Sequence, residues 1–197
     1  ESHVDRSITD PLAFVKTNVL GTTTLLQTAK EFWKDDYTNK LFYHISTDEV
    51  YGELPFDSKE KFSDKTPYSP SPDNLYANSK AEADRIVMEF YKNTAMNITI
   101  SNCSNNYGPF QFPEKYIPIL FTNLIDGMKA PLHGDGRHVR DWIHTEDHAI
   151  AIDLILSRGK AGETYLIGSD NDLPNKYIAE RIVYLSGKDE SWIKYVP

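Results

Sequence analysis

The chain has 197 residues and little cysteine, and it lacks long apolar runs. Its single cysteine, Cys103, excludes an internal disulfide, and such scarcity is typical of a reducing compartment. No apolar run approaches the roughly 18 residues that a membrane-spanning helix needs. The polar, charged first residues do not resemble a signal peptide. We therefore expect a cytoplasmic protein that makes no membrane contact.

Positive charge is also scarce. Lys and Arg total 21 against 29 for Asp and Glu, which gives a formal net charge of −8. A surface that binds nucleic acid needs a basic stripe to neutralise phosphates, so this class of partner is excluded. A small anionic ligand held by a few local donors is not excluded. Hydrophobic residues make up 40% of the chain, which is enough for a sizeable core.

The glycine-rich G-x-G-x-x-G turn that binds dinucleotide pyrophosphates is absent. The nearest candidate, HGDGRH at 133–138, does not fit that fingerprint. The chain begins without Met and ends abruptly at WIKYVP. We expect sequence to be missing at both ends.

Predicted strands alternate with predicted helices along the whole chain, which is typical of an α/β fold with a mostly parallel sheet. Asp10 and Pro11 predict the cap and first turn of a helix that continues to residue 33. Its predicted apolar side comprises Phe14, Val15, Leu20, Leu25 and Leu26. A second helix over 75–92 places Ala83, Ile86, Val87 and Phe90 on one face. Further strands are predicted at 41–46, 97–103 and 163–168, and further helices at 116–128 and 175–187. The segment 140–159 is predicted to be a strand or loop followed by a helix.

Two loops hold the densest polar chemistry. STDE follows the first strand, and SNCSNNYG spans the end of the second. Ligands of parallel α/β sheets bind beyond the carboxyl ends of the strands. The sequence therefore predicts a ligand site at these loops, after residues 46 and 103.

Tyr76 and Lys80 form a Y-x-x-x-K pair in YANSK. Residues i and i+4 share a helix face, and an ammonium near a phenol lowers the pKa of the phenol. The resulting phenolate can take a proton from a sugar hydroxyl. The alternative is an amphipathic helix with an exposed Lys and a half-buried Tyr.

Thr47, Asp48 and Glu49 directly follow a predicted strand. Two neighbouring carboxylates push their pKa values apart, so that one acts as an acid and the other as a base. Elimination of water across a carbon–carbon bond requires such a pair. The alternative is an ordinary polar turn after a strand.

Four segments carry a resemblance to a known family: STDEVYG, YANSK, NCSNNYGPFQFPEK and VRDWIHTEDHA. In this order they resemble the dTDP-glucose 4,6-dehydratases of the extended short-chain dehydrogenase/reductase superfamily, over essentially the whole chain. The resemblance implies a Rossmann-like doubly wound parallel sheet with a smaller C-terminal substrate-binding region, incomplete at both ends. It assigns 1–107 to the NAD-binding domain and 108–197 mainly to the substrate region, with 139–158 returning to the first domain.

The resemblance also implies a mechanism in deoxysugar biosynthesis. Tyr76 is the base for oxidation at C4, with hydride passing to NAD, and Lys80 tunes Tyr76 and holds the nicotinamide ribose. Thr47 hydrogen-bonds the C4 hydroxyl. Glu49 removes the C5 proton and Asp48 protonates the departing C6 hydroxyl. The hydride returns to C6, so dTDP-glucose becomes a 4-keto-6-deoxy sugar nucleotide plus water.

Binding residues and partners follow from the same resemblance. Thr17 and Asn106 match cofactor contacts, and the matches to sugar-nucleotide contacts are Ser2, Asn105, Lys115, Arg140 and Asn175. Family members are usually homodimers, which implies an interface over 10–32 and 75–95. As alternatives, Arg140 pairs with the next residue, Asp141, and either Asn caps a turn.

Other readings stay open. UDP-sugar 4-epimerases and UDP-glucuronate decarboxylases are similar, but Asp48 argues against both. A truncated, non-catalytic sugar-nucleotide-binding protein is a further alternative. His133 stands where the family often has Tyr, so the chain departs from the family at a position that contacts the base or the diphosphate. His144 and His148 flank Glu146 in the wrong order for a zinc-protease helix, so we expect a polar first helical turn and no metal site.

Overall fold

The computed structural model describes residues 1–55 and 58–197 and separates into two compact units. Unit 1 comprises Glu1–Cys103 and Ile150–Ile167, and unit 2 comprises Ser104–Ala149 and Gly168–Pro197. The segment that returns to unit 1 is therefore Ile150–Ile167, whereas the resemblance implied 139–158.

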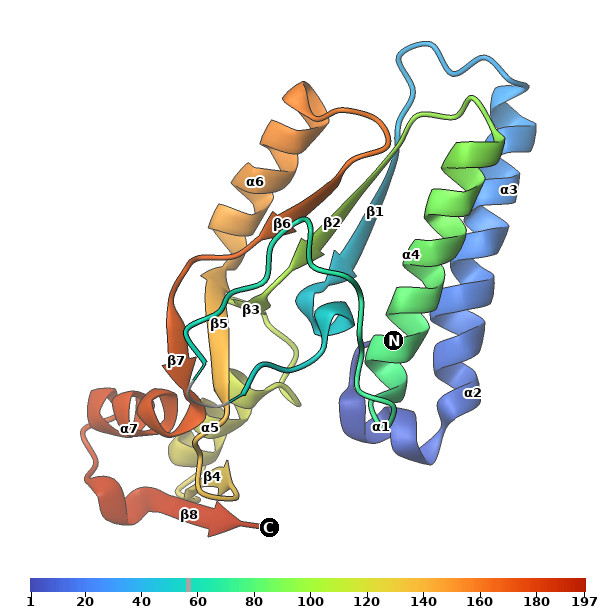
Figure 1. Cartoon of the computed structure of the whole chain (residues 1–197). Coiled ribbons are helices and arrows are strands. Elements are labelled where there is room, and N and C mark those ends of the chain that lie inside the picture. Colours follow the sequence, from blue (N-terminus) through green and yellow to red (C-terminus); the bar gives the residue numbers. More distant parts are fainter. Residues whose placement is uncertain (56–57) are drawn as a thin grey trace. The chain divides into compact units, whose positions relative to one another are not determined.

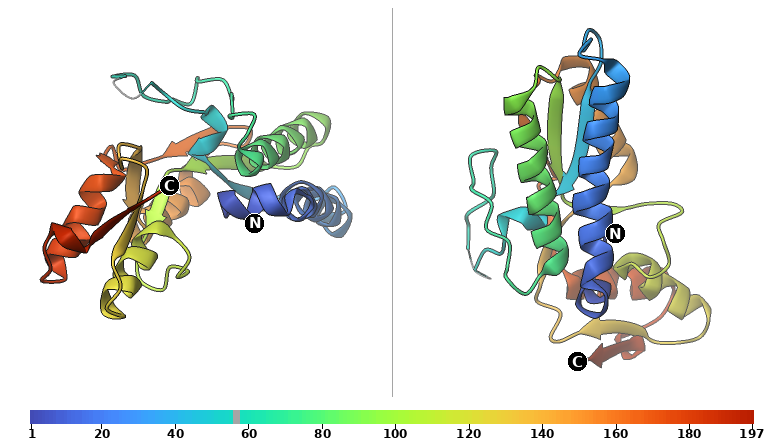
Figure 2. Two further views of the ribbon diagram at one scale, coloured as in Figure 1. Left: turned by 90° about the horizontal axis from the view of Figure 1, so that it is seen from below. Right: turned by 90° about the vertical axis from the view of Figure 1, so that its right-hand side faces the viewer.

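Unit 1 is built on a parallel sheet. Its strands are β1 (Phe42–Thr47), β2 (Ile98–Cys103) and β6 (Thr164–Ile167), in the order β1-β2-β6, and both pairings are parallel. Helix α4 (Leu75–Asn93) makes the crossover from β1 to β2 and packs beside α3 (Gly21–Trp33). Figures 1 and 2 show α3 and α4 on one face of this sheet and the 150–158 part of helix α6 on the other. The predicted α/β arrangement is confirmed.

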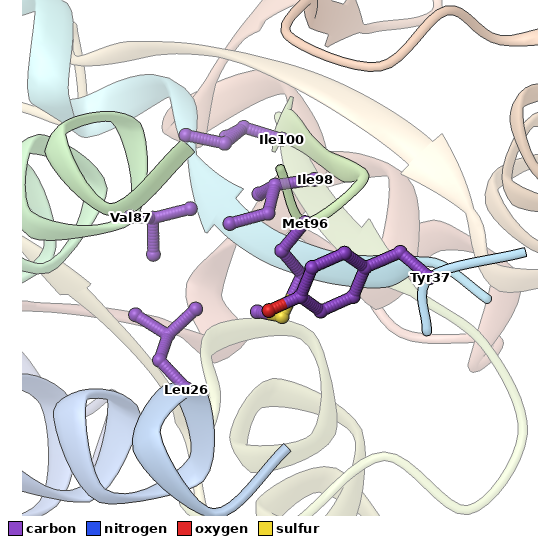
Figure 3. Packing of buried hydrophobic residues seen from close by; sticks show 6 residues of the cluster. All are labelled: Leu26, Tyr37, Val87, Met96, Ile98 and Ile100. Atoms are coloured by element: carbon purple, nitrogen blue, oxygen red, sulfur yellow. The ribbon is translucent and has the colours of Figure 1, made fainter. Parts of the chain in front are cut away.

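The core of unit 1 lies between this sheet and helices α3 and α4. Figure 3 shows its buried side chains converging from α3, α4, strand β2 and the segments that precede β1 and β2: Leu26, Tyr37, Val87, Met96, Ile98 and Ile100. Burial of each large apolar side chain contributes roughly 1.5–3 kcal/mol. The predicted apolar face of α4 is confirmed, because Ala83 and Val87 are fully buried. Ile86 and Phe90 are partly buried and pack against the core cluster of Figure 3.

The helix predicted from Pro11 to residue 33 is divided into α2 (Pro11–Phe14), the π-helical turn η1 (Val15–Leu20) and α3. A short helix that the sequence did not predict, α1 (Val4–Thr9), precedes it. As predicted, Asp10 caps α2 by accepting from the Ala13 N–H at 3.3 Å, and Pro11 is its first residue. The predicted apolar side is partly wrong: Phe14 and Leu26 are buried, but Val15, Leu20 and Leu25 are exposed. A π-helical turn has more residues than an α-helical one, which changes the face that later residues occupy.

Helix α3 ends in a left-handed residue that is not glycine. Lys34 has φ 51° and ψ 44°, and its N–H donates to the Lys30 carbonyl at 3.0 Å. Glycine adopts this conformation without a steric penalty. We expect Lys34→Gly to raise the free energy of unfolding by about 0.5–1 kcal/mol, measured by urea denaturation. Lys34→Ala keeps the Cβ and should give no such gain. A Gly variant less stable than wild type contradicts this prediction.

Unit 2 contains two small sheets. In the first, β3 (Asn105–Tyr107) pairs parallel with β5 (Val139–His144), which pairs antiparallel with β7 (Asp172–Pro174). In the second, β4 (Ala130–His133) pairs parallel with β8 (Ile193–Val196). Four of these five strands have only three or four residues, too few to show a period-2 pattern, which is why the sequence did not predict them.

The helices of unit 2 lie where the sequence predicted them. Helices α5 (Tyr116–Ile125) and α7 (Asn175–Leu185) enclose an apolar cluster with β4, formed by Leu120, Leu124, Ala130, Leu132, Ala179 and Val183. Helix α6 (Thr145–Arg158) begins in unit 2 and ends in unit 1, and the short 3-10 helix η3 (Glu190–Trp192) precedes β8. Within the described ranges, no helix combines the length and the apolar character needed to cross a membrane.

Candidate active site

Unit 1 brings the five predicted catalytic residues together at the carboxyl end of β1. Thr47 is the last residue of β1, and Asp48 and Glu49 open the 3-10 helix η2 (Asp48–Tyr51), which packs against α4 (Figure 1). Tyr76 and Lys80 lie in the first two turns of α4. The Lys80 ammonium donates to the Ile45 carbonyl on β1 at 2.8 Å. The loop predicted after residue 46 therefore brings the residues at the end of β1 close to those of α4.

The two carboxylates of the turn have different partners. The Thr47 hydroxyl donates to Asp48 Oδ1 at 3.3 Å and accepts from the Glu49 N–H at 3.3 Å. The Asn74 side-chain amide donates to Glu49 Oε2 at 2.7 Å. Different partners are the first requirement for one carboxyl to act as an acid and the other as a base.

Asn74 is a residue of the site that was not predicted from the sequence. Besides holding Glu49, it caps α4 by accepting from the Ala77 N–H at 3.0 Å. The signal was present, because Asn directly before a predicted helix is a common N-cap. Its second role has no sequence signal, since Glu49 is 25 residues away.

Tyr76 sits in an environment that favours its neutral form. Burial raises the pKa of Tyr76 above the usual value of 10.0, the negative charge of Glu49 adds to this, and a hydrogen bond with Thr47 opposes it. The ring packs edge-on against Phe14, with centroids 6.4 Å apart. The predicted lowering of this pKa by Lys80 is therefore wrong for the chain as it is arranged here. Lys80 is bound to the Ile45 carbonyl instead.

Buried tyrosines make the stability of the chain sensitive to alkaline pH. Burial raises the pKa of Tyr51 to about 12, with smaller contributions from Asp84, Asp64 and Asp48. Above pH 10.0 the unfolded chain loses this proton while the folded chain keeps it. The neutral Tyr51 side chain therefore makes its full contribution to stability below pH 10.0. This contribution is lost as the pH rises through the pKa of about 12 that Tyr51 has in the folded chain.

We expect the free energy of unfolding to fall more steeply with pH in wild type than in Tyr51→Phe, on the alkaline side of 10.0. Urea denaturation at a series of pH values measures both slopes. Tyr177→Phe, which changes an exposed ring, serves as the control and should keep the wild-type slope. Equal slopes for wild type and Tyr51→Phe would count against this electrostatic assignment.

Two predicted binding residues, Ser2 and Thr17, also belong to unit 1, and both are exposed. The neighbour of Thr17, Asn18, is buried and donates to the Ser79 hydroxyl of α4 at 2.9 Å. Asn18 thus links the π-helical turn to α4. It was not among the predicted site residues.

The other five predicted binding residues belong to unit 2. Asn105 and Asn106 open β3, Lys115 directly precedes α5, Arg140 lies on β5, and Asn175 begins α7. The Asn106 amide donates to the Ser104 carbonyl at 3.0 Å, and its side-chain oxygen lies 2.7 Å from His148 Nδ1. Asn175 Oδ1 is buried without a hydrogen-bond partner among the described residues.

Arg140 and Asp141 do not form the alternative pair. The Arg140 guanidinium donates to the Val139 carbonyl at 2.9 Å. Asp141 accepts from the Ser169 hydroxyl and N–H and from the Asn171 N–H, at 2.6 to 2.9 Å. Burial raises the pKa of Asp141, but these hydrogen bonds outweigh it and hold the pKa below its usual range. Asp141 therefore fixes the loop after β6, and Arg140 is not neutralised by it.

The two histidines at the start of α6 have separate partners. His144 Nδ1 accepts from the Glu146 N–H at 3.3 Å, whereas His148 contacts Asn106. Burial lowers the pKa of His148. Among the side chains that the structure describes, no three His, Cys, Asp or Glu residues form a group that could hold a metal ion. His133 is exposed, and its Nδ1 lies 2.9 Å from the Pro197 carbonyl oxygen.

The chain matches one family model, and its similar relatives include several dTDP-glucose 4,6-dehydratases. Residues 1–194 match the sequence profile of the family described as GDP-mannose 4,6 dehydratase. The chain is 45% identical over 186 residues to the dTDP-glucose 4,6-dehydratase of Salmonella typhimurium, covering 89% of this chain and 51% of that protein. The chain thus spans about half the length of the curated relatives it matches.

Solved structures agree with this. The dTDP-glucose 4,6-dehydratase DesIV of Streptomyces venezuelae, determined with NAD bound, has 42% identity and a TM-score of 0.91 over 100% of this chain and 58% of its own. The Bacillus anthracis dTDP-glucose 4,6-dehydratase in complex with NAD has 44% identity and a TM-score of 0.85 over 94% of this chain and 57% of its own. The predicted Rossmann-like fold is confirmed, and the chain is a part of that fold.

Proposed function

Since the chain belongs to the GDP-mannose 4,6-dehydratase family, we propose that the protein containing it is an NAD-dependent dTDP-glucose 4,6-dehydratase. The observation that carries this proposal is the Asp48–Glu49 pair, held with different partners on one turn beside Tyr76 and Lys80. Membership of the family does not by itself identify the nucleotide or the sugar of the substrate. Relatives of 42–45% identity that are dTDP-glucose 4,6-dehydratases support that choice.

Each residue of the turn has a role in the proposed reaction. Tyr76 takes the proton of the C4 hydroxyl, and the Thr47 hydroxyl orients that group. The resulting C4 ketone acidifies the C5 proton, which Glu49 removes. Asp48 gives a proton to the C6 hydroxyl, which leaves as water. The hydride returns to C6 and Glu49 returns the proton to C5, so the sum is dTDP-4-keto-6-deoxyglucose plus water.

The raised pKa of Tyr76 constrains its role as a base. A neutral phenol must lose its proton to act, and the Lys80 ammonium lies one helical turn away, bound to the Ile45 carbonyl. We propose that Lys80 moves from this carbonyl toward the phenol and a ribose hydroxyl when the ligands bind. A charge that approaches a buried phenol lowers its pKa.

The donors present fit the nicotinamide end of NAD. Lys80 is a half-buried cation at the carboxyl edge of a parallel sheet, where such sheets bind dinucleotides, and Tyr76 lies one turn before it. NAD would supply the acceptor that holds the C4 hydride until its return at C6. Thr17 and Asn106 remain proposed cofactor contacts. Ser2, Asn105, Lys115, Arg140 and Asn175 remain proposed sugar-nucleotide contacts.

Mass spectrometry of dTDP-glucose incubated with NAD and the complete protein tests the proposal. Loss of one water is the expected result. An unchanged mass with glucose converted to galactose would identify an epimerase, and an unchanged sugar with bound NAD would identify a binding protein. Either of these results would overturn the dehydratase assignment. A cytoplasmic location is proposed on composition alone.

We further propose a homodimer through the helices of unit 1. Large apolar side chains are exposed along α2 and α3: Leu12 is 64% exposed, Leu25 63% and Phe32 81%. These lie in the proposed interface over 10–32. We expect Leu25→Asp to convert a dimer of the complete protein to a monomer in sedimentation experiments. Glu31→Gln, a change of an exposed polar residue on the same helix, should leave the dimer intact. A dimer that persists in Leu25→Asp would place the interface elsewhere.

A further inference from the structure

A buried polar network is hydrogen-bonded to Thr47, the residue that precedes the two carboxylates of the candidate catalytic turn. Asp84 on α4 is only 1% exposed, and His44 on β1 and Asn102 on β2 are also buried. Asp84 Oδ1 lies 3.0 Å from His44 Nε2, and Asp84 Oδ2 accepts from the Asn102 amide at 3.3 Å. The proposed mechanism uses none of these three residues.

The network reaches the catalytic turn through hydrogen bonds. The Asn102 amide donates to the Thr47 carbonyl at 3.1 Å, and its oxygen accepts from the Tyr68 hydroxyl at 3.2 Å. Thr47 in turn holds Asp48 and the Glu49 N–H. A continuous set of contacts thus runs from the Asp84 carboxylate to the Asp48 carboxylate and to the backbone N–H of Glu49.

A carboxylate at this depth is costly to fold. Taking an ionised group out of water costs several kcal/mol, and apolar residues of similar volume often stabilise such positions more. Strongly buried ionisable groups concentrate at functional sites for this reason. The simpler role for Asp84, fixing α4 against β1 and β2, would be met by a neutral side chain at lower cost.

We propose that Asp84 is a positioning residue of the active site, which holds Asn102 against the Thr47 carbonyl and places a negative charge one helical turn from Lys80. The inference rests on the proposed function for its effect on turnover. Its electrostatic part concerns Lys80 directly and does not depend on turnover.

The charge around Lys80 supports this role. Burial lowers the pKa of Lys80, while Asp84 on the same helix and Cys103 on β2 oppose this. From the other packed elements, η2 supplies Asp48 and Glu49, which act on Tyr76, and β1 supplies His44, which is bound to Asp84. Removing the Asp84 charge should therefore lower the Lys80 pKa further.

The test compares Asp84→Asn with Asn102→Ala in the complete protein, with Glu82→Gln as the control. Glu82 lies on the same helix but is exposed and paired with Arg85. Asp84→Asn keeps the shape and removes the charge. Asn102→Ala keeps the charge and removes the contact to Thr47. Two readouts are taken: kcat and KM for dTDP-glucose, and the pH dependence of Lys80 acetylation by mass spectrometry.

We expect both variants to lower kcat at least about tenfold with KM changed less than about twofold. Only Asp84→Asn should shift the Lys80 acetylation midpoint, downward by at least about half a pH unit. Glu82→Gln should match wild type in both readouts. An Asp84→Asn protein with wild-type kcat and an unchanged Lys80 midpoint would overturn the inference, as would loss of folding in both variants. A wild-type protein that releases no water would refute the proposed function instead, and the acetylation result would still decide the electrostatic part.

Discussion

Glu49→Gln is expected to stop loss of water from dTDP-glucose, with a fall in turnover of at least about a hundredfold. Gln retains an oxygen that can accept from the Asn74 amide, so the turn should keep its shape. It cannot take a proton from C5. Mass spectrometry of the sugar nucleotide measures water loss, and deuterium exchange at C5 from solvent measures the proton transfer directly. Both signals should disappear together.

The control for Glu49→Gln is Glu53→Gln, an exposed carboxylate four residues further along. It changes net charge equally and should leave turnover as in wild type. If Glu49→Gln loses water at the wild-type rate, Glu49 is not the base and the acidic pair is an ordinary polar turn. If C5 exchange persists while water loss stops, Glu49 acts at C6, and the roles of Glu49 and Asp48 must be exchanged.

The sequence predicted the long elements of the fold well, for a physical reason. Helix α4 has a periodic apolar pattern, and its burial follows the predicted face, whereas β1 is apolar and β2 is rich in β-branched residues. The N-terminal helix failed at the π-helical turn over Val15–Leu20. Its one-letter sequence fits an α-helix equally well, and only packing against α4 distinguishes the two.

The candidate site was predictable where its residues are close in sequence. Thr47, Asp48 and Glu49 are consecutive, and Tyr76 and Lys80 are one helical turn apart, so their proximity follows from local geometry. The supporting residues come from separate segments: His44 from β1, Asp84 from α4 and Asn102 from β2. Each reads alone as an ordinary polar residue. Parallel pairing of β1 with β2, with Thr47 opposite Cys103, is what makes them neighbours.

The pKa of Tyr76 was predicted in the wrong direction because the pair was considered without its surroundings. Lys80 shares a helix face with Tyr76, which favours a phenolate. Burial of the ring and the Glu49 carboxylate favour the neutral phenol more strongly, and Lys80 bonds to the strand. Thus the oxidation and elimination residues are electrostatically coupled, since the base proposed for C5 opposes ionisation of the base proposed for C4.

Tyr76→Phe separates these two functions. Phenylalanine keeps the edge-on packing against Phe14, so the fold should persist, but no phenol remains to take the C4 proton. We expect turnover of dTDP-glucose to fall at least about a thousandfold. Tyr91→Phe, on the same helix, is the control and should turn over normally, because its hydroxyl donates to the Ala161 carbonyl at 3.4 Å and not to the candidate catalytic turn.

The decisive comparison supplies a dTDP-sugar that already carries a ketone at C4. Oxidation is then unnecessary, because the C5 proton is acidic from the start and water can leave across C5 and C6. Tyr76→Phe should release water from this substrate near the wild-type rate, whereas Glu49→Gln should not. If both variants fail on the 4-keto substrate, Tyr76 also takes part in the elimination. If both succeed, Glu49 does not carry the elimination. Release of water by Tyr76→Phe but not by Glu49→Gln would assign the oxidation to Tyr76 on α4 and the elimination to Glu49 on the turn.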